Sequence, residues 1–183
     1  MIFSKITSAK VIRDNIADAP KSGGVYKHFI NKEGLKYLSG VDPTEQETAD
    51  DGSTVYLLYI GLAKDIQYRL KWHLGIVNVS HSCIVHGTLS TLRLSYMSNH
   101  ENINCLSEQE KLNEFLNKYV YMSYYETPDF KSIESSLISS HDLPLNIKDN
   151  KHSFVQTNKA RRKEMKAAYK QLTSTSNGTK TVG

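Results

Sequence analysis

Three segments predict β-strands because they are short, apolar and rich in β-branched or aromatic residues. They cover residues 25–30, 54–60 and 119–125. The segment 42–51, between the first two, holds five acidic residues and no basic one, which predicts a solvated loop. We expect the first two strands to pair as an antiparallel hairpin with this long acidic segment at its tip.

Apolar residues at helical spacing predict the other elements. The predicted helices cover residues 5–19, 65–74, 89–94, 107–116 and 127–137. Ser107 and Glu110 have the spacing of a capping box, and Thr127-Pro128 places a cap before a proline at a first helical position. This order of elements predicts an α+β fold, with a small three-stranded antiparallel sheet flanked by helices, a long hairpin insertion and a basic C-terminal helix.

Composition narrows the class of protein. The 183 residues suit one domain, and 39% hydrophobic and 23% charged residues with a mean hydropathy of -0.46 are typical of a globular chain. No apolar run approaches the roughly 20 residues that span a bilayer. Two cysteines are too few for a disulfide framework. We therefore expect an intracellular, cytoplasmic protein without a membrane partner.

Positive charge is concentrated near the C-terminus. Residues 148–183 hold nine basic and two acidic residues, a net charge of +7, whereas residues 1–147 carry −3. Such a segment can follow a phosphate backbone, although a lone basic run is more often a solvated helix. Arg93 is a further candidate for DNA contact, with a helix-capping or salt-bridge role equally good. The candidate DNA-binding residues of the basic segment are Lys159, Arg161, Arg162, Lys163 and Lys166.

Several polar residues recur at informative spacing, although each alone is more often structural. Arg69 follows the second of two motif tyrosines by ten residues, and His73 lies one helical turn later. The complete set is Gly24-Val25-Tyr26, Tyr59-Ile60-Gly61, Arg69, His73, Glu134 and Asn146. In order and spacing these blocks resemble the GIY-YIG nuclease pattern over residues 22–146. The longer gap between the tyrosines departs from that pattern, and we expect it to alter access or substrate choice more than chemistry.

The resemblance implies a division of the chain. We expect a lead-in helix over 1–21, a GIY-YIG nuclease domain over 22–148, a basic segment over 149–172 and a flexible tail over 173–183. The implied activity is Mg²⁺-dependent hydrolysis of double-stranded DNA, with 5′-phosphate and 3′-hydroxyl products. One Mg²⁺ or Mn²⁺ ion per active site is expected, because a single carboxylate suits one hard ion better than two.

The resemblance also implies residue roles. Tyr26 is assigned as the water-activating base, with Tyr59 positioning water or sharing that task, and the sequence does not decide between them. A phenol with a pKa of about 10 needs a nearby cation to act as a base. Arg69 and Lys64 are the cations at hand, and Arg69 would also bind the scissile phosphate.

The remaining implied roles belong to three residues. By this resemblance, His73 would act as a proton shuttle or as a hydrogen-bond donor that faces a phosphate. Glu134, at the edge of a predicted apolar helix stripe, would hold the metal ion. Asn146 would fix the active-site loop or bond a phosphate oxygen.

The biological role stays open between several readings. Restriction or a phage or mobile-element role fits a compact chain with no room for further modules, and a restriction enzyme reading a palindrome is expected to dimerise on DNA. The alternatives are a DNA-repair or branched-DNA nuclease and a non-catalytic DNA-binding protein. The sequence contains no phosphate-binding motif of the GxxxxGK[ST] type, so we expect no nucleotide cofactor. His81, Cys83 and His86 offer metal-ligand types, but no second pair follows.

Overall fold

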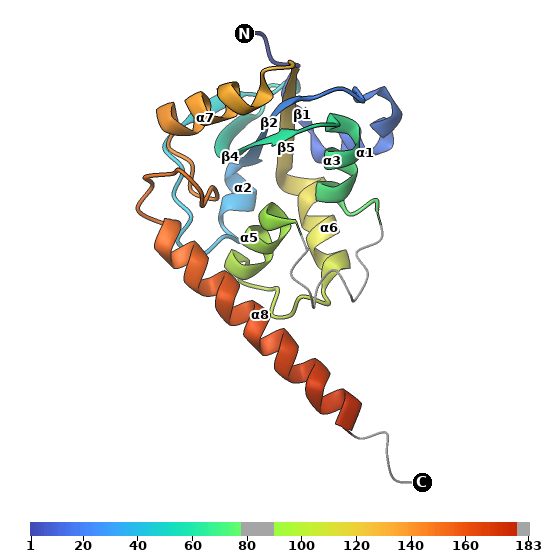
Figure 1. Cartoon of the computed structure of the whole chain (residues 1–183), viewed down its shortest axis with the longest axis vertical. Coiled ribbons are helices and arrows are strands. Elements are labelled where there is room, and N and C mark those ends of the chain that lie inside the picture. Colours follow the sequence, from blue (N-terminus) through green and yellow to red (C-terminus); the bar gives the residue numbers. More distant parts are fainter. Residues whose placement is uncertain (78–89, 179–183) are drawn as a thin grey trace.

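The computed structural model describes residues 1–77 and 90–178 and shows an α+β fold around one antiparallel sheet (Figure 1). The strand order is β1-β5-β2-β4-β3. The strands are β1 (Thr7–Ser8), β2 (Gly24–Asn31), β3 (Gln46–Thr48), β4 (Thr54–Ala63) and β5 (Val120–Glu126). The α+β class is confirmed, but the expected three strands are wrong because two short strands extend the sheet to five.

Strand β3 corrects the prediction for the acidic segment. Gln46–Thr48 pairs antiparallel with the first residues of β4, although all three residues are exposed. A strand exposed on both faces has no apolar alternation, so the sequence pattern could not show it. The segment is solvated, as predicted, but it is not entirely a loop.

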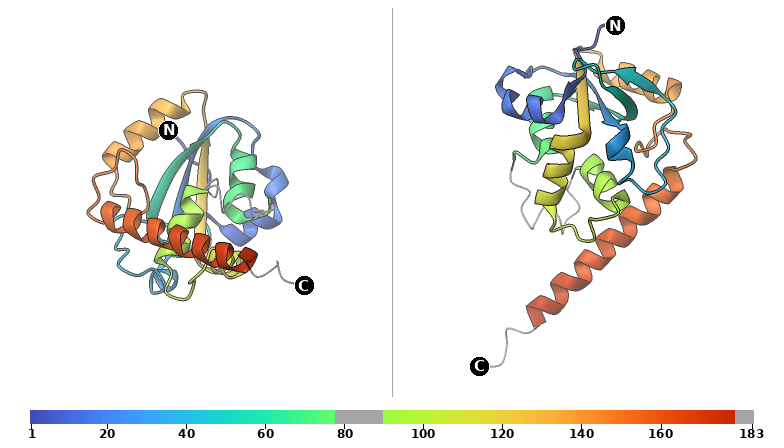
Figure 2. Two further views of the ribbon diagram at one scale, coloured as in Figure 1. Left: turned by 60° about the horizontal axis from the view of Figure 1, so that its bottom comes forward. Right: turned by 180° about the vertical axis from the view of Figure 1, so that it is seen from behind.

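Helices cover both faces of the sheet (Figure 2). The helices are α1 (Ala9–Asp14), the 3-10 helix η1 (Ile16–Asp18), α2 (Lys32–Leu35), α3 (Ile66–Leu74), α5 (Thr91–Asn99), α6 (Gln109–Tyr119), α7 (Phe130–Ser140) and α8 (Val155–Gly178). Within the expected lead-in helix, the chain forms the short strand β1 and two brief helices instead. Residues 173–178, expected to be a flexible tail, belong to α8, and 179–183 lie outside the described residues.

Two hydrophobic cores lie on opposite sides of the sheet. One packs the sheet against α3, α5 and α6 and includes Tyr26, Leu70 and Phe115. The other packs the sheet against α7 and includes Ile60 and Ile138. Because side chains alternate along a strand, neighbouring residues of β2 and β4 enter different cores.

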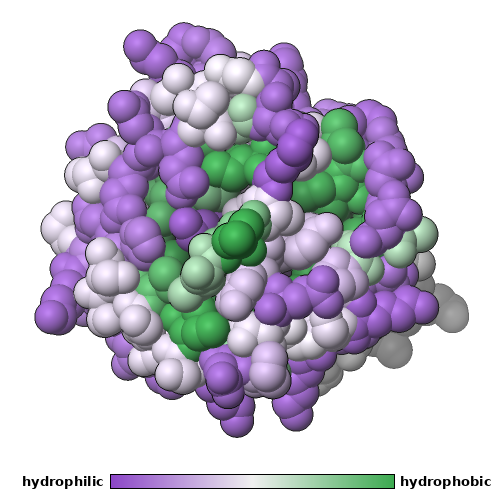
Figure 3. Space-filling model, turned by 90° about the horizontal axis from the view of Figure 1, so that it is seen from above, coloured by the Kyte–Doolittle hydropathy of each residue, from purple (hydrophilic) through white to green (hydrophobic). Residues whose placement is uncertain are grey.

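Helix α8 packs against α5 and then extends beyond the rest of the domain (Figures 1 and 2). Within the described part of the chain, no helix combines the length and apolar character that a membrane span requires. The face opposite the α8 end, seen in Figure 3, presents hydrophobic residues in patches between hydrophilic ones. The apolar surface on that face is therefore divided rather than continuous.

The start of α6 differs from the predicted capping box. The hydroxyl of Ser107 contacts the sulfur of Cys105 instead of the helix backbone. The carboxylate of Glu108 accepts hydrogen bonds from the backbone nitrogens of Asn104, at 2.7 Å, and Cys105, at 3.1 Å. The capping-box prediction is wrong because the N-cap residue of α6 is Glu108 and not Ser107, and the side chain of Glu108 forms no capping hydrogen bond there.

Candidate active site

A β-bulge places Tyr59 on the same face of the sheet as Tyr26. His28 pairs with Tyr59, whereas the next residue of β2 pairs with Leu57, so Leu58 is an extra residue in β4. One extra residue shifts the alternation of side chains along the bulged strand. The rings of Tyr26 and Tyr59 are therefore stacked, with centroids 6.2 Å apart and an interplanar angle of 30°.

Gly61 leaves the space that the two rings occupy. It lies opposite Tyr26 in the ladder, and a Cβ atom there would lie 2.4 Å from the Tyr26 hydroxyl and 2.7 Å from Cε1 of Tyr59. Both distances are well inside van der Waals contact. The glycine of the second motif block is therefore required by packing against both tyrosines.

A buried chain of hydrogen bonds through His73 and Ser90 holds the hydroxyl of Tyr26. Its hydroxyl lies 2.9 Å from Nε2 of His73, and Nδ1 of His73 lies 2.7 Å from Oγ of Ser90. Burial lowers the pKa of His73 well below its usual value, and the positive charge of Arg69 acts in the same direction, so the imidazole is neutral. His73 is 2% exposed. It therefore supports Tyr26 and does not face a phosphate.

The two tyrosines differ in how readily they ionise. Burial raises the pKa of Tyr26 well above its usual value, and a hydrogen bond to Tyr59 raises it further. Burial also raises the pKa of Tyr59 above its usual value, and the negative charge of Glu134 raises it too, whereas the hydrogen bond from Tyr26 and the cations Arg69 and Arg162 act in the opposite direction. With Tyr26 only 2% exposed, Tyr59 is both the easier phenol to ionise and the one that reaches the surface.

Tyr59 opens into a cleft of about 360 Å³. The polar side chains that line it are Tyr59, Thr91, Glu134, Asn146, Lys148, Asp149 and Arg162. They come from β4, α5, α7, α8 and the segment between α7 and α8. The cleft therefore joins elements from both faces of the sheet.

The open edge of β4 explains how α7 reaches this cleft. Strand β3 pairs with β4 only over Thr54–Tyr56, so the outward backbone groups beyond it need other partners. The backbone nitrogen of Leu145 donates to the carbonyl of Leu58 at 3.0 Å. The Glu134 carboxylate accepts a hydrogen bond from the backbone of Leu62, which lowers its pKa against the larger opposite effect of burial. Glu134 thus reaches around the edge of β4.

Asn146 completes this edge. Its Oδ1 accepts from the backbone nitrogen of Ile60 at 2.9 Å, and its Nδ2 donates to the carbonyl of Ile60 at 2.7 Å. The side chain is 4% exposed. Because both ends of the amide are engaged by β4, the geometry supports the loop-fixing alternative for Asn146 and not phosphate binding.

Glu134 has the properties of a single metal-binding carboxylate. Burial raises its pKa, and the negative charge of Asp149 raises it too, whereas Lys148 lowers it. Among residues 1–77 and 90–178, no cluster of three or more His, Cys, Asp or Glu side chains could hold a metal ion. Mg²⁺ keeps several waters and needs only one or two carboxylates. Glu134, with Asp149 at the same cleft, fits an ion that needs one or two carboxylates, whereas zinc-type coordination does not fit.

The two predicted cations occupy different places. Arg69, on α3, is partly buried and lies close enough to Tyr26 and Tyr59 to lower both pKa values. Lys64 is exposed and lines a separate hollow beside Gly23 and Phe130. The structure brings Arg69 to the phenols but does not bring Lys64 there.

Arg93 is not a DNA contact. It is 1% exposed, and its guanidinium donates to the carbonyl of His73 at 2.8 Å, to Gln109 at 2.6 Å and to Asn113 at 2.9 Å. Burial lowers its pKa to about 10. Arg93 caps the C-terminal end of α3, so the capping alternative holds and no carboxylate forms a salt bridge with it among the described residues.

The basic residues of α8 divide between two faces. Arg161 donates to the carbonyl of Ser39 at 2.6 Å and to Oδ1 of Asn99 at 3.0 Å, so it faces the body of the domain and is not available to DNA. The other four predicted residues line a second hollow of about 350 Å³ with Leu94 and Ile147. They are Lys159, Arg162, Lys163 and Lys166.

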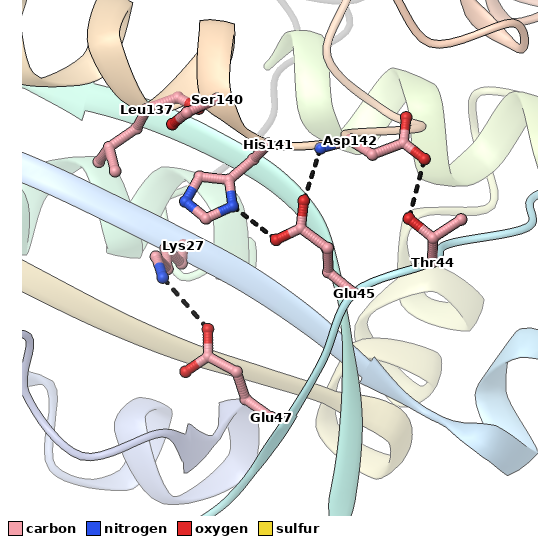
Figure 4. A network of polar contacts seen from close by, with 8 residues as sticks. All are labelled: Lys27, Thr44, Glu45, Glu47, Leu137, Ser140, His141 and Asp142. Carbon is pink, nitrogen blue, oxygen red and sulfur yellow. Dashed lines mark hydrogen bonds and ion pairs between the residues drawn. The ribbon is translucent and has the colours of Figure 1, made fainter.

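The connection between β2 and β4 is tied to the end of α7 (Figure 4). The Glu45 carboxylate contacts Nδ1 of His141 at 2.5 Å and accepts from the backbone nitrogen of Asp142 at 2.7 Å. Thr44 donates to the Asp142 carboxylate at 2.9 Å. The insertion therefore supports the helix that carries Glu134.

Sequence reasoning missed two contributions to the site. Arg162 was assigned to DNA binding, but its effect on the pKa of Tyr59 places it beside the phenol. Ser90 was assigned no role, although it holds His73. No signal in the sequence pointed to either contact. His81, Cys83 and His86 lie outside the described residues.

Comparison with known protein families agrees with the geometry. A family model described as the GIY-YIG catalytic domain matches residues 24–171, which is more than half of the chain. No curated protein and no solved structure matches the chain.

Proposed function

Because the chain belongs to the GIY-YIG nuclease family, we propose that it is a Mg²⁺-dependent endonuclease that hydrolyses phosphodiester bonds in double-stranded DNA. The observation that carries this proposal is the convergence of Tyr59 and Glu134 in one cleft, with Arg69 beside the phenol. Phosphoryl transfer depends mainly on positioning and on stabilising charge at the phosphoryl oxygens. A base and a carboxylate in one cleft, with the guanidinium of Arg69 close enough to act on the charge of the base, would supply those requirements.

In the proposed mechanism, Tyr59 is the base. Because the pKa of Tyr59 is raised, its phenolate is the minor species near neutral pH. This phenolate accepts a proton from the attacking water while the hydroxyl of Tyr26 donates to its oxygen. His73 donates from Nε2 to Tyr26, and Ser90 donates to Nδ1 of His73, so each donor supports the next. Because Tyr26 gives its single hydroxyl proton to Tyr59, its oxygen must accept from His73, so the neutral imidazole carries its proton on Nε2.

Arg69 binds the phosphate under attack. A guanidinium remains charged at any physiological pH and can donate to two oxygens at once. The water oxygen bonds to phosphorus and the 3′ oxygen leaves, taking up a proton from solvent or the cleft. The expected products are a 5′-phosphate and a 3′-hydroxyl.

Glu134 is the residue that would hold the divalent ion. When bound, Mg²⁺ supplies charge stabilisation at the phosphoryl oxygens and lowers the pKa of nearby water. Because burial raises the pKa of Glu134, the ionised form needed for the ion is lost at a higher pH than for an exposed glutamate. The cleavage rate should therefore fall as pH drops through the raised pKa of Glu134.

For the biological role we propose restriction or a phage or mobile-element function inside the cell. A restriction enzyme acting on a palindrome would work as a dimer, with each subunit cutting one strand. A repair or branched-DNA nuclease would instead prefer damaged or branched duplexes to intact plasmid.

The test is incubation of purified protein with unmethylated supercoiled plasmid in Mg²⁺ or in EDTA. We expect discrete fragments with Mg²⁺, none with EDTA, and none from Glu134→Gln, which keeps its size and fold. Branched and damaged duplexes in parallel identify the repair alternative. Binding without cleavage under every metal condition would identify a non-catalytic DNA-binding protein and overturn the proposal.

A further inference from the structure

The active-site cleft and the hollow along α8 adjoin each other. The cleft beside Tyr59 and the hollow beside Lys163 have two lining residues in common, Ile147 and Arg162. The hollow runs between α8, α5 and the segment before α8. A strand that reaches Tyr59 therefore has a way out along α8.

Arg162 stands at the junction with part of its hydrogen-bonding capacity unused. Its Nε is buried without a hydrogen-bond partner among the described residues. Burial lowers the pKa of its guanidinium, and only the phenol of Tyr59 acts against this effect. An unpaired guanidinium in a partly buried place is costly, and an anion that enters the cleft would relieve that cost.

The positive charges of the other basic residues in the hollow are also without a negatively charged partner among the described residues. Lys159, Arg162, Lys163 and Lys166 follow helical spacing along one face of α8, and none of them forms an ion pair among the described residues. Burial and the charges of Arg162 and Lys170 lower the pKa of Lys166. At 1.5 Å per residue this face is about 10 Å long. Along the axis of a B-DNA duplex, one strand presents a phosphate about every 3.4 Å. The length of this face therefore corresponds to about three phosphates, measured along the axis.

A solvated helix face is the simpler explanation for basic residues, but two observations disfavour it. Arg162 is partly buried, whereas the head of a solvated arginine extends into water. Arg161, the next residue along, uses its guanidinium on Ser39 and Asn99, so α8 has one basic face that holds the domain and another that holds no protein partner. The second face points at the cleft.

We propose that Arg162 is a second phosphate-binding guanidinium of the active site, and that the α8 groove binds the backbone of the strand leading away from the cut. This inference rests on the proposed nuclease function. Arg162 contacts the phosphate next to the scissile one and favours the ionised form of Tyr59. Lys163 and Lys166 contact the following phosphates.

The first experiment measures binding in EDTA, so it does not depend on cleavage. Fluorescence anisotropy on a 20-base-pair duplex over a range of KCl concentrations gives the slope of log K against log [salt]. For Lys163→Gln/Lys166→Gln we expect the slope to decrease by about two, since each phosphate contact contributes roughly 0.9. Lys170→Gln, which removes one charge of α8 outside the groove, should leave it unchanged. An equal slope for the double variant and wild type would overturn the groove.

The second experiment measures single-turnover cleavage at saturating DNA against pH. Arg162→Gln should reduce the rate at least about 100-fold, as removal of one charged donor does at comparable sites. It should also move the rise in rate to higher pH, because the phenol loses a stabilising cation. Arg162→Lys should recover part of the rate.

Thermal unfolding of each variant shows whether the fold is kept, and a melting temperature near the wild-type value assigns the change in rate to the site. A wild-type rate and pH profile for a folded Arg162→Gln would overturn the role of Arg162. If wild-type protein cuts nothing, the proposed function fails, while the salt-dependence experiment still decides the groove.

Discussion

Replacing Asn146 by Ala tests whether the open edge of β4 holds the active site together. The amide exchanges two hydrogen bonds with the backbone of Ile60, at 2.9 and 2.7 Å, in a place only 4% exposed. The variant leaves a buried N–H and a buried C=O without partners. Each unpaired group costs about 1–3 kcal/mol, so the free energy of unfolding should fall by about 2–6 kcal/mol.

The substitution Asn146→Asp makes the same interaction depend on pH. An ionised carboxylate still accepts from the Ile60 nitrogen but repels the Ile60 carbonyl, whereas a protonated carboxyl donates to it. The folded protein therefore raises the pKa of the new carboxyl group above its unfolded value of about 3.9. The stabilisation is complete below the unfolded pKa and is lost as pH rises through the folded one.

Urea unfolding of wild type and both variants at pH 4, 5.5 and 7 measures these effects. Asn102→Asp, at an exposed position, is the matched control and should change the free energy of unfolding by less than about 0.5 kcal/mol at each pH. If Asn146→Ala unfolds like the control, or if Asn146→Asp loses the same stability at pH 4 and pH 7, the side chain of Asn146 does not hold the edge of β4.

Three further predictions test other parts of the structure. Gly61→Ala should displace the ring of Tyr26, destabilise the protein by about 1–3 kcal/mol and reduce cleavage strongly, as seen by urea unfolding and plasmid assay; a fully active variant would show that the close packing is not needed. His28 is buried, both its ring nitrogens lack partners among the described residues, and burial lowers its pKa to about 3. Because the unfolded chain binds a proton near pH 6.5, the wild-type protein should lose about 2 kcal/mol from this residue between pH 7 and pH 5, and His28→Leu should remove that loss; identical pH dependence of unfolding would count against it. Glu45→Gln should weaken the contact with His141 and speed amide hydrogen exchange at the end of α7, while unchanged exchange would mean that the insertion does not support that helix.

The sequence predicted the elements whose signal is local. The structure contains the two motif strands, the helix from Ile66 and the helix after Pro128, all of which have a strong local pattern. The cap predicted at Thr127-Pro128 is wrong, because α7 begins at Phe130 and its N-cap residue is Asp129, whose side chain forms no capping hydrogen bond. The two- and three-residue strands β1 and β3 have no such signal, because their pairing depends on where β5 and β4 lie in space. The number of strands in the sheet was therefore beyond reach of local pattern.

The direction of side chains was harder to predict than their elements. A basic residue at helical spacing looks the same whether it contacts DNA or a buried carbonyl, so the sequence leaves DNA contact open for Arg93 and Arg161. The bulge at Leu58 has no sequence mark, although it decides that Tyr59 joins Tyr26. The order of the motif blocks indicated which residues meet, but not which phenol faces the cleft.

A crystal structure of Tyr59→Phe bound to a DNA duplex in Ca²⁺ tests most directly whether position 59, Glu134 and Arg69 surround one phosphate. The variant should not cut the duplex. We expect one ion at about 2.3–2.6 Å from the Glu134 carboxylate, the usual range of Ca²⁺–oxygen distances in proteins. We also expect one phosphate between that ion and Arg69. The phenylalanine ring at position 59 should face the side of the phosphorus from which water attacks. A phosphate bound elsewhere, or an ion that does not contact Glu134, would show that these groups do not form one active site.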